Sequence, residues 1–145
     1  MPARLIDTAE ILACRILAID DEEANVLLLR SLLEREGYGD VHCLTDPTKA
    51  LAAYIDLAPD LVLLDLRMPE VDGFQLLEAF ARHDRADEFR PVLVLTADTT
   101  IQARRRALSL GAKDFLAKPF DVIEVALRIS NLLETRMLYE RLRQA

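Results

Sequence analysis

The chain has 145 residues, of which 52% are apolar, and this predicts one packed globular domain, not a disordered segment. Its formal net charge of −7 argues against direct binding to nucleic acid. No apolar run approaches the roughly 18–20 residues that cross a membrane. The two cysteines form no CxxC pair, so we expect a reduced, cytoplasmic protein without membrane attachment.

Five short apolar runs predict β-strands. Runs such as LVLLD and VLVL are apolar at consecutive positions, which is typical of strands buried on both faces of a parallel sheet. The five predicted strands cover residues 15–20, 41–44, 61–65, 91–96 and 114–118.

Helical patterns alternate with these strands. Gly37 is a natural C-cap for the first helix, while Asp46 and Pro47 are suited to begin the second. The alternation predicts an α/β fold, a doubly wound parallel sheet with helices on both faces. The predicted helices cover residues 22–37, 46–58, 72–84, 99–111, and a long stretch from Asp121 towards the C-terminus.

Polar residues gather where the predicted strands end. Asp20 and Asp21 end the first strand, Asp65 the third, Thr96 the fourth and Lys118 the fifth. In an open doubly wound sheet, ligands bind beyond the carboxyl ends of the strands, where the strand order reverses. We therefore expect these five side chains to form one site.

The composition of this site indicates its chemistry. Three neighbouring carboxylates repel one another and need a cation, and oxygen ligands favour a hard ion such as Mg²⁺. Mg²⁺ held by carboxylates supports phosphoryl transfer because it neutralises charge on the transferring oxygens. With a hydroxyl from Thr96 and an ammonium group from Lys118, such a site is suited to place a phosphoryl group on Asp65 and hold it.

Four segments, AIDDEEAN, LVLLDLRMPEVDGF, VLVLTAD and GAKDFLAKPF, carry a family resemblance. Over about residues 15–130 the chain resembles the receiver domain of bacterial two-component response regulators. The resemblance implies a flavodoxin-like sheet of five strands in the order 2-1-3-4-5. It also implies a signalling switch that modifies itself, not a metabolic enzyme.

The resemblance assigns a role to each site residue. Asp65 matches the aspartate that receives phosphate from a sensor histidine kinase or a phosphotransfer protein. Asp20 and Asp21 match the pair that binds Mg²⁺ together with Asp65, and the backbone carbonyl of Arg67 is implied as a further ligand. Thr96 matches a switch hydroxyl that turns towards the phosphoryl group.

Four further positions follow from the same resemblance. Lys118 matches the lysine that pairs with the phosphoryl group, and Phe115 matches an aromatic switch position that could rotate inward after phosphorylation. Pro119 matches a proline that often follows a cis peptide bond. Glu70 departs from the glycine most common after MP, a change expected to alter only a loop tip.

Two small residues fit this interpretation. Ala97 leaves room for a phosphodonor, and Gly73 is expected to let the chain turn sharply into the third predicted helix.

Two other classes of protein fit the sequence less well. A dehalogenase-type aspartate-based phosphatase needs a carboxylate at position 67, where this chain has Arg67. A flavodoxin needs a phosphate-cradling loop after the first strand, whereas DDEEAN would repel phosphate.

The predicted domain organisation has three parts. Residues 1–13 form an N-terminal extension, 14–133 the receiver domain, and 134–145 a helix extension or the start of a linker to an output module. The chain is either a stand-alone regulator or a receiver from a longer protein with an effector domain. Its tail weakly resembles the connecting helix of regulators with a cyclic-di-GMP phosphodiesterase or cyclase module.

The predicted fourth helix has two apolar sides. Ala103, Ala107 and Leu110 are expected to face the sheet, and Ile101 and Leu108 to lie on another side. With the fourth helix, fifth strand and fifth helix forming one surface, phosphorylation is expected to rearrange that surface and control partner binding or homodimer formation. The alternative is an ordinary solvated basic face with scattered apolar residues.

The last predicted helix is expected to outrun the sheet. At 1.5 Å per residue, residues 121–143 span about 35 Å, against about 17–20 Å for a strand. One apolar side should dock on the domain: Val122, Val125, Ala126, Ile129, Leu132 and Leu133. A second apolar stripe should pack on a second subunit: Ile123, Leu127, Leu138 and Leu142. The alternative is a frayed, partly disordered tail. Charged residues should line that contact: Glu134, Arg136, Glu140 and Arg141.

Overall fold

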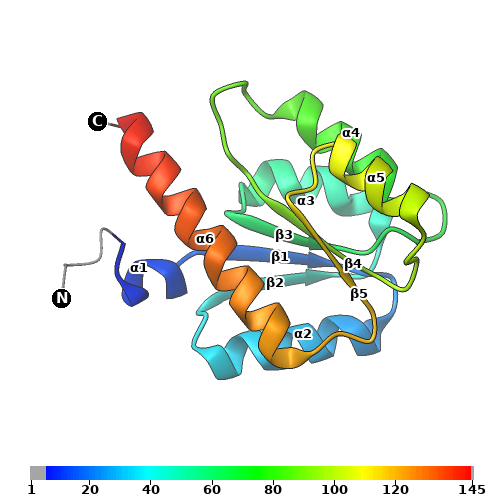
Figure 1. Cartoon of the computed structure of the whole chain (residues 1–145), viewed down its shortest axis with the longest axis horizontal. Helices are drawn as coiled ribbons and strands as arrows, with labels where there is room; N and C mark the ends of the chain where they lie inside the picture. The colour runs from blue at the N-terminus through cyan, green and yellow to red at the C-terminus, as the bar shows by residue number, and fades with distance from the viewer. Residues whose placement is uncertain (1–5, 145) are drawn as a thin grey trace.

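The computed structural model describes residues 6–144, so Ala145 and residues 1–5 of the predicted N-terminal extension lie outside the described part. Strands and helices alternate as predicted (Figure 1). In chain order the elements are α1 (Thr8–Leu12), β1 (Arg15–Ile19), α2 (Glu23–Glu36), β2 (Asp40–Leu44), the 3-10 turn η1 (Pro47–Lys49), α3 (Ala50–Leu57), β3 (Leu61–Leu64), α4 (Gly73–His83), β4 (Val92–Thr96), α5 (Ile101–Ser109), β5 (Asp114–Ala117) and α6 (Val122–Gln144).

The five strands form one parallel sheet in the order β2-β1-β3-β4-β5, which confirms the predicted topology. Ile16 of β1 pairs with Val41 of β2 on one side and with Leu61 of β3 on the other. The chain therefore leaves β1 in one direction to form β2 and returns to build β3 on the opposite side. The carboxyl ends of β1 and β3 flank the point where the strand order reverses.

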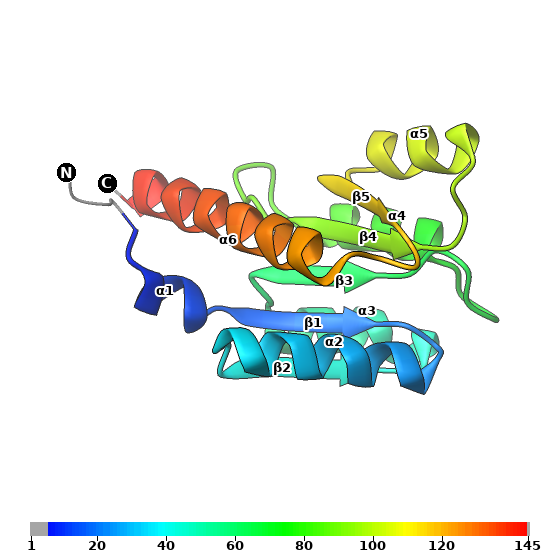
Figure 2. The same ribbon diagram turned by 60° about the horizontal axis from the view of Figure 1, so that its bottom comes forward.

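Each face of the sheet has its own core. Ile16 and Ala18 of β1 pack in the cluster beneath α1, α2 and α6, while Leu17 and Ile19 pack beneath α3, α4 and α5. Figures 1 and 2 show these two helical layers on opposite sides of the strands. Because successive side chains alternate between faces, burial on both sides explains why a central strand such as β3 is apolar at consecutive positions.

Local signals end and start several helices as predicted, with small shifts. Gly37 ends α2 in the left-handed region at φ 99°, where glycine has no Cβ penalty. Asp46 caps the short 3-10 turn η1, so α3 itself begins only at Ala50. Asp72 forms a capping box at α4, and Thr100 caps α5, which therefore begins two residues later than residue 99.

Helix α5 presents the two sides that its sequence predicts. Ala103 and Ala107 are buried against the sheet, and Leu110 packs at the edge of the same cluster. Ile101 and Leu108 are exposed, at 65% and 40% of their surface. None of the helices in residues 6–144 combines the length and apolar character that a membrane crossing needs.

The first half of α6 docks largely as predicted. Val125, Ile129 and Leu133 are fully buried in the core under α6, at one-turn spacing. Val122 was expected on this side, but it is 43% exposed. Ile123 and Leu127 are exposed at 72% and 59%, in agreement with the predicted second stripe.

The second half of α6 outruns the sheet as predicted (Figure 2), and Leu142 of the predicted second stripe is 76% exposed. Contrary to the prediction, however, part of this half packs within the chain itself. The sequence pattern did not predict helix α1, which lies beside the end of α6 and places Ile11 in the shared core (Figure 2). Glu10 of α1 accepts two 2.9 Å hydrogen bonds from Arg141, a residue that the prediction placed at a contact with another subunit. Leu138 also packs against this core, so it is not part of an exposed stripe.

Arg136 was predicted at a subunit contact, but its guanidinium is buried within this chain, with 6% of the residue exposed. It donates to the Phe89 carbonyl at 2.9 Å, to Glu140 at 2.7 Å and to Asp60 at 3.3 Å. Asp60 also accepts the Arg15 backbone N–H at 2.8 Å. A buried arginine needs such partners, because an unpaired buried charge is costly. This cluster ties α6 to the amino edge of the sheet.

Gly73 is needed for a different reason from the predicted sharp turn. Its φ angle lies outside the left-handed region, and the close approach of neighbouring backbone atoms is what requires glycine. A Cβ atom at this position would lie 2.5 Å from the Asp65 carbonyl oxygen and 2.7 Å from the Leu66 Cα atom. The Gly73 N–H also donates to the Leu66 carbonyl at 2.9 Å. The start of α4 is therefore packed directly on the backbone that carries Asp65.

Replacing Gly73 by alanine should destabilise the fold. Gly73→Ala should lower the free energy of unfolding by about 1–3 kcal/mol, the usual cost of overpacking, because backbone atoms cannot rotate away. Urea unfolding followed by circular dichroism measures this change. Gly39→Ala is the matched control, since a Cβ atom added at Gly39 would have no heavy atom within 4 Å. Equal destabilisation by both variants would contradict the close-approach argument.

Candidate functional site

Three carboxylates meet at the carboxyl ends of β1 and β3. Asp20 and Asp21 follow β1, and Asp65 follows β3. Oxygen atoms from the three side chains all lie within 4.8 Å of one another. Asp20 and Asp65 are buried, with 2% and 8% of their surface exposed, and Asp21 is half-buried. The structure thus brings together the acidic residues that the strand-end pattern predicted.

Lys118 supplies the opposite charge from the end of β5. Its ammonium group donates to Asp20 at 2.5 Å and to Asp65 at 3.3 Å. Burial of the ammonium group favours its neutral form, but hydrogen bonds and attraction from Asp20 and Asp65 outweigh burial and raise the pKa of Lys118 above its usual value. Lys118 therefore stays protonated and offsets part of the carboxylate repulsion.

Thr96 lies at the end of β4 and is fully buried. Its hydroxyl oxygen accepts a 3.2 Å hydrogen bond from the Asp98 backbone N–H. Beside it, Ala97 is exposed and lines a cavity of about 450 Å³ together with Asp65, Thr96 and Lys118. The open space over Asp65 agrees with the predicted entry route for a phosphodonor.

One polar contact of the site was not predicted. The Arg67 guanidinium crosses from the loop after β3 to Asp98 in the loop after β4, with an Nε–Oδ2 distance of 2.8 Å and a second bond from Nη2. Hydrogen bonds from Arg67 and then from Thr100 hold the pKa of the Asp98 carboxyl below its usual range. The two residues are 31 positions apart, so no local spacing pattern could have paired them.

The Lys118–Pro119 peptide bond is cis, as the resemblance implied. At the loop tip, Glu70 adopts φ 69°, in the left-handed region that favours glycine. The substitution at this position therefore leaves a glycine-like backbone in place. Glu70 is exposed and does not belong to the acidic cluster, which agrees with an effect confined to the loop.

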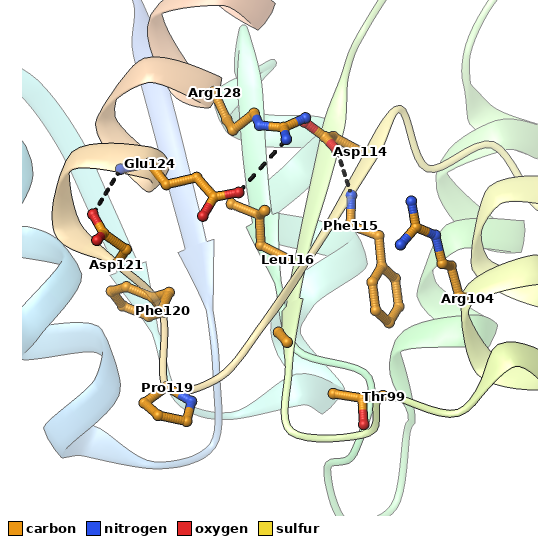
Figure 3. Close-up of a pocket in the computed structure, with 11 residues that line it drawn as sticks. Thr99, Arg104, Asp114, Phe115, Leu116, Pro119, Phe120, Asp121, Glu124 and Arg128 are labelled. Carbon is orange, nitrogen blue, oxygen red and sulfur yellow. Dashed lines mark hydrogen bonds and ion pairs between the residues drawn. The ribbon is translucent and has the colours of Figure 1, made fainter.

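Phe115 differs from the expected switch. The ring was expected to rotate inward after phosphorylation, but in this structure Phe115 is already buried, with 8% of its surface exposed. It packs in the core beneath α5, with the Arg104 guanidinium 5.9 Å from the ring centroid (Figure 3). An inward rotation cannot therefore start from this conformation.

The acidic cluster fits a hard divalent cation. Its donors are carboxylate oxygens only, and Asp21 keeps the site open to solvent on one side. Mg²⁺ prefers one or two carboxylates together with water and substrate oxygens, a donor set that this arrangement can supply. The implied participation of the Arg67 carbonyl stays a prediction.

A five-stranded parallel sheet with an aspartate cluster at its β1/β3 switch point defines a class of flavodoxin-like signalling domains. The sequence profile described as "Response regulator receiver domain" matches residues 16–130. The chain belongs to this family, whose domains serve signal transduction and are not metabolic enzymes. The resemblance seen in the sequence is thus confirmed.

Individual relatives agree with the family. The chain is 44% identical to a "DNA-binding dual master transcriptional regulator", RpaA, of Synechocystis, over 82% of this chain and 48% of the relative. It is 37% identical to the response regulator PleD of Caulobacter vibrioides, over 92% of this chain and 29% of the relative. The chain spans about half the length, or less, of the first curated relatives it matches.

Solved structures give the same result. A putative response regulator from Chloroflexus aurantiacus matches with a TM-score of 0.75 and 30% identity, over 83% of this chain and 98% of the other. The chemotaxis protein CheY4 of Vibrio cholerae matches with a TM-score of 0.75 and 26% identity, with the same coverage of 83% and 98%. Both similarities extend over nearly the whole of the compared chains.

Removing Lys118 should leave the carboxylates without their cation. In the absence of divalent ions, Lys118→Met should lower the free energy of unfolding by about 1–3 kcal/mol. This loss is smaller than the loss on breaking a fully enclosed ion pair, because the site opens to solvent. Urea unfolding at pH 7 measures the loss, with the exposed Lys49→Met as control. In the Lys118→Met background, Asp20→Asn should restore part of the stability; no recovery would contradict the repulsion argument.

The sign of the pH dependence follows from the raised pKa of Lys118. Because the folded pKa lies above the ordinary 10.5, the stabilising contribution is complete below that pH. It disappears only as the pH rises through the folded value. The stability difference between wild type and Lys118→Met should therefore be constant across neutral pH and shrink in alkaline solution.

Proposed function

We propose that Asp65 is the phosphoacceptor of this receiver domain and that a sensor histidine kinase or a phosphotransfer protein is the donor. The observation that carries the proposal is the cluster of Asp20, Asp21 and Asp65, in which the Lys118 ammonium group contacts Asp20 and Asp65 and in which Asp65 lines an open cavity. A carboxylate at the base of that cavity is a nucleophile placed where a donor can reach it.

The proposed reaction moves one phosphoryl group. An Asp65 carboxylate oxygen attacks phosphorus, the phosphorus–nitrogen bond of a phosphohistidine breaks, and the freed histidine nitrogen takes up a proton. Mg²⁺, held by Asp20, Asp21 and Asp65, would neutralise charge on the phosphoryl oxygens. Lys118, which contacts Asp65 in the described structure, would pair with the phosphoryl group, and the Thr96 hydroxyl would turn to donate to it.

The proposed output surface comprises α5, β5 and α6, which correspond to the predicted fourth helix, fifth strand and fifth helix because α1 precedes them. A cavity of about 480 Å³ lies on this surface. Figure 3 shows Arg104 and Phe115 on one side of it, and Glu124 and Arg128 on the other. Exposed Ile123 adds an apolar contact area beside these charges.

The buried Phe115 changes how we expect the switch to operate. Phosphorylation would select the inward ring already present in this structure, instead of creating it, and so would shift a population between two packings. The selected surface would then bind a partner or a second receiver. We propose that an effector domain in a longer protein reads the result; the cyclic-di-GMP module and the absence of direct nucleic-acid contact stay predictions.

Acetyl phosphate provides a direct test of the chemistry. In the presence of Mg²⁺, intact-mass measurement should show one added phosphoryl group on wild type and none on Asp65→Asn. Asp21→Ala should abolish the gain, because it removes a proposed ligand of the metal, and chelation of divalent ions should do the same. The exposed Asp56→Asn is the matched control and should gain the group normally. An undiminished gain in Asp65→Asn would overturn the assignment.

Association of two receivers is tested by sedimentation. At tens of micromolar, beryllofluoride with Mg²⁺ should convert the protein from monomer to dimer. Leu127→Ser should weaken that dimer, because Leu127 is 59% exposed on the proposed surface, while Leu51→Ser on α3 should not. A monomer under both conditions would rule out dimerisation as the output of this chain.

A further inference from the structure

One ion pair bridges the two loops that flank Asp65. Arg67 follows the acceptor by two residues, and its backbone N–H lies 3.4 Å from the Asp65 Oδ1 atom. Its guanidinium reaches Asp98 in the loop that follows β4. The Arg67 side chain is 64% exposed, whereas the Asp98 side chain is 11% exposed. An exposed cation at the cavity rim is thus paired with an anion that is largely shielded from solvent.

Asp98 connects this ion pair to the switch hydroxyl. Its Oδ1 atom accepts from the Thr100 N–H at 3.2 Å and from the Thr100 hydroxyl at 2.9 Å. Its backbone N–H donates to the Thr96 hydroxyl oxygen at 3.2 Å. While Arg67 holds the Asp98 carboxylate, the loop therefore keeps a donor on the Thr96 oxygen. A Thr96 hydroxyl that turns to the phosphoryl group must break this bond.

A phosphoryl group on Asp65 would compete for the same guanidinium. It carries a charge of about −1.5 to −2 near pH 7 and three acceptor oxygens, against the single charge of a carboxylate. Arg67 lines the cavity above Asp65, so its side chain has access to that position. Because its cation is exposed to solvent, this ion pair contributes little net free energy, and a stronger anion can therefore displace the Asp98 carboxylate.

From this geometry we propose that the Arg67–Asp98 ion pair holds the β4–α5 loop in place in the unphosphorylated state, and that a phosphoryl group on Asp65 displaces Asp98 as the partner of Arg67. We call this ion pair the brace and its change of partner the handover. The exchange of partners releases the loop and frees the Thr96 hydroxyl to turn. Arg67 and Asp98 act here as positioning residues, because neither carries the transferred group. The proposal rests on the phosphoacceptor role of Asp65.

The resting brace is tested without any phosphodonor. Arg67→Gln removes the charge at the cavity rim, and Asp98→Asn removes its partner while keeping an oxygen for Thr100. In both variants the backbone amide hydrogens of residues 97–101 should exchange with solvent about two- to fivefold faster than in wild type. This is the effect expected for the loss of one partly exposed ion pair. Arg105→Gln, which removes an exposed charge from α5, is the matched control and should not change exchange. Unchanged exchange in both brace variants would overturn the brace.

The exchange of partners is tested by nuclear magnetic resonance. The Arg67 Nε–H and Asp98 side-chain carboxyl resonances report the two halves of the ion pair, with Arg67→Gln identifying the arginine signal. Beryllofluoride with Mg²⁺ should shift both resonances in wild type. It should also raise amide exchange in residues 97–101 to the level of untreated Asp98→Asn. An Asp98 resonance that stays at its paired position would overturn the handover.

Mass measurement on separate samples of the same proteins, without beryllofluoride, distinguishes the two proposals. If wild type gains a phosphoryl group from acetyl phosphate but Asp98 stays paired, only the handover is wrong. If wild type gains none, the phosphoacceptor role fails and the handover with it. Asp98→Asn should still gain the group, because both Asp65 and the acidic cluster are intact in that variant.

Discussion

The attraction between Lys118 and the carboxylates at the ends of β1 and β3 is the constraint on which the site depends. Asp20 and Asp65 are nearly buried, and such charges stay ionised at acceptable cost only with a partner. Lys118 reaches Asp20 across 98 positions of sequence, so this pairing exists only when the sheet has closed with β5 at its edge. The architecture of the whole sheet is thus needed to hold one small group of charges together.

That constraint extends to the neighbouring loops. The start of α4 sits on the backbone of Asp65, so close that Gly73 leaves no space for a side chain. On the other side, fully buried Thr96 fixes the end of β4, and the loop beyond it is held by Asp98 and Arg67. The contacts at Gly73 and Thr96 are buried and closely packed, while the Arg67 side of the ion pair is exposed to solvent. A change at Asp65 therefore has one direction in which it can readily spread, towards the β4–α5 loop.

The sequence predicted what depends on short repeating patterns. Consecutive apolar residues indicated strands buried on both faces, and the strand ends indicated Asp20, Asp21, Asp65, Thr96 and Lys118 as one site. Long-range polar contacts leave no such pattern. The Arg67–Asp98 pair was therefore missed, and the buried Arg136 was wrongly placed at a subunit contact. Helix α1 has only five residues, too few for a periodic signal. Rotamer state is not encoded locally either, which is why the inward position of Phe115 was not foreseen.

The two halves of helix α6 are held in place by different contacts. Its second half is fixed to the amino edge of the sheet by the buried Arg136 and to α1 by Arg141, far from the carboxyl edge that carries Asp65. Its first half begins next to the carboxyl edge, where Ile123 and Leu127 are exposed and where Glu124 and Arg128 line the cavity of the output surface. Both halves of the helix are docked on the domain, because Val125, Ile129 and Leu133 are also fully buried. A rearrangement that starts at Asp65 would therefore act first on α5 and on the exposed side of the first turns of α6, while the buried side of the helix stays docked on the core.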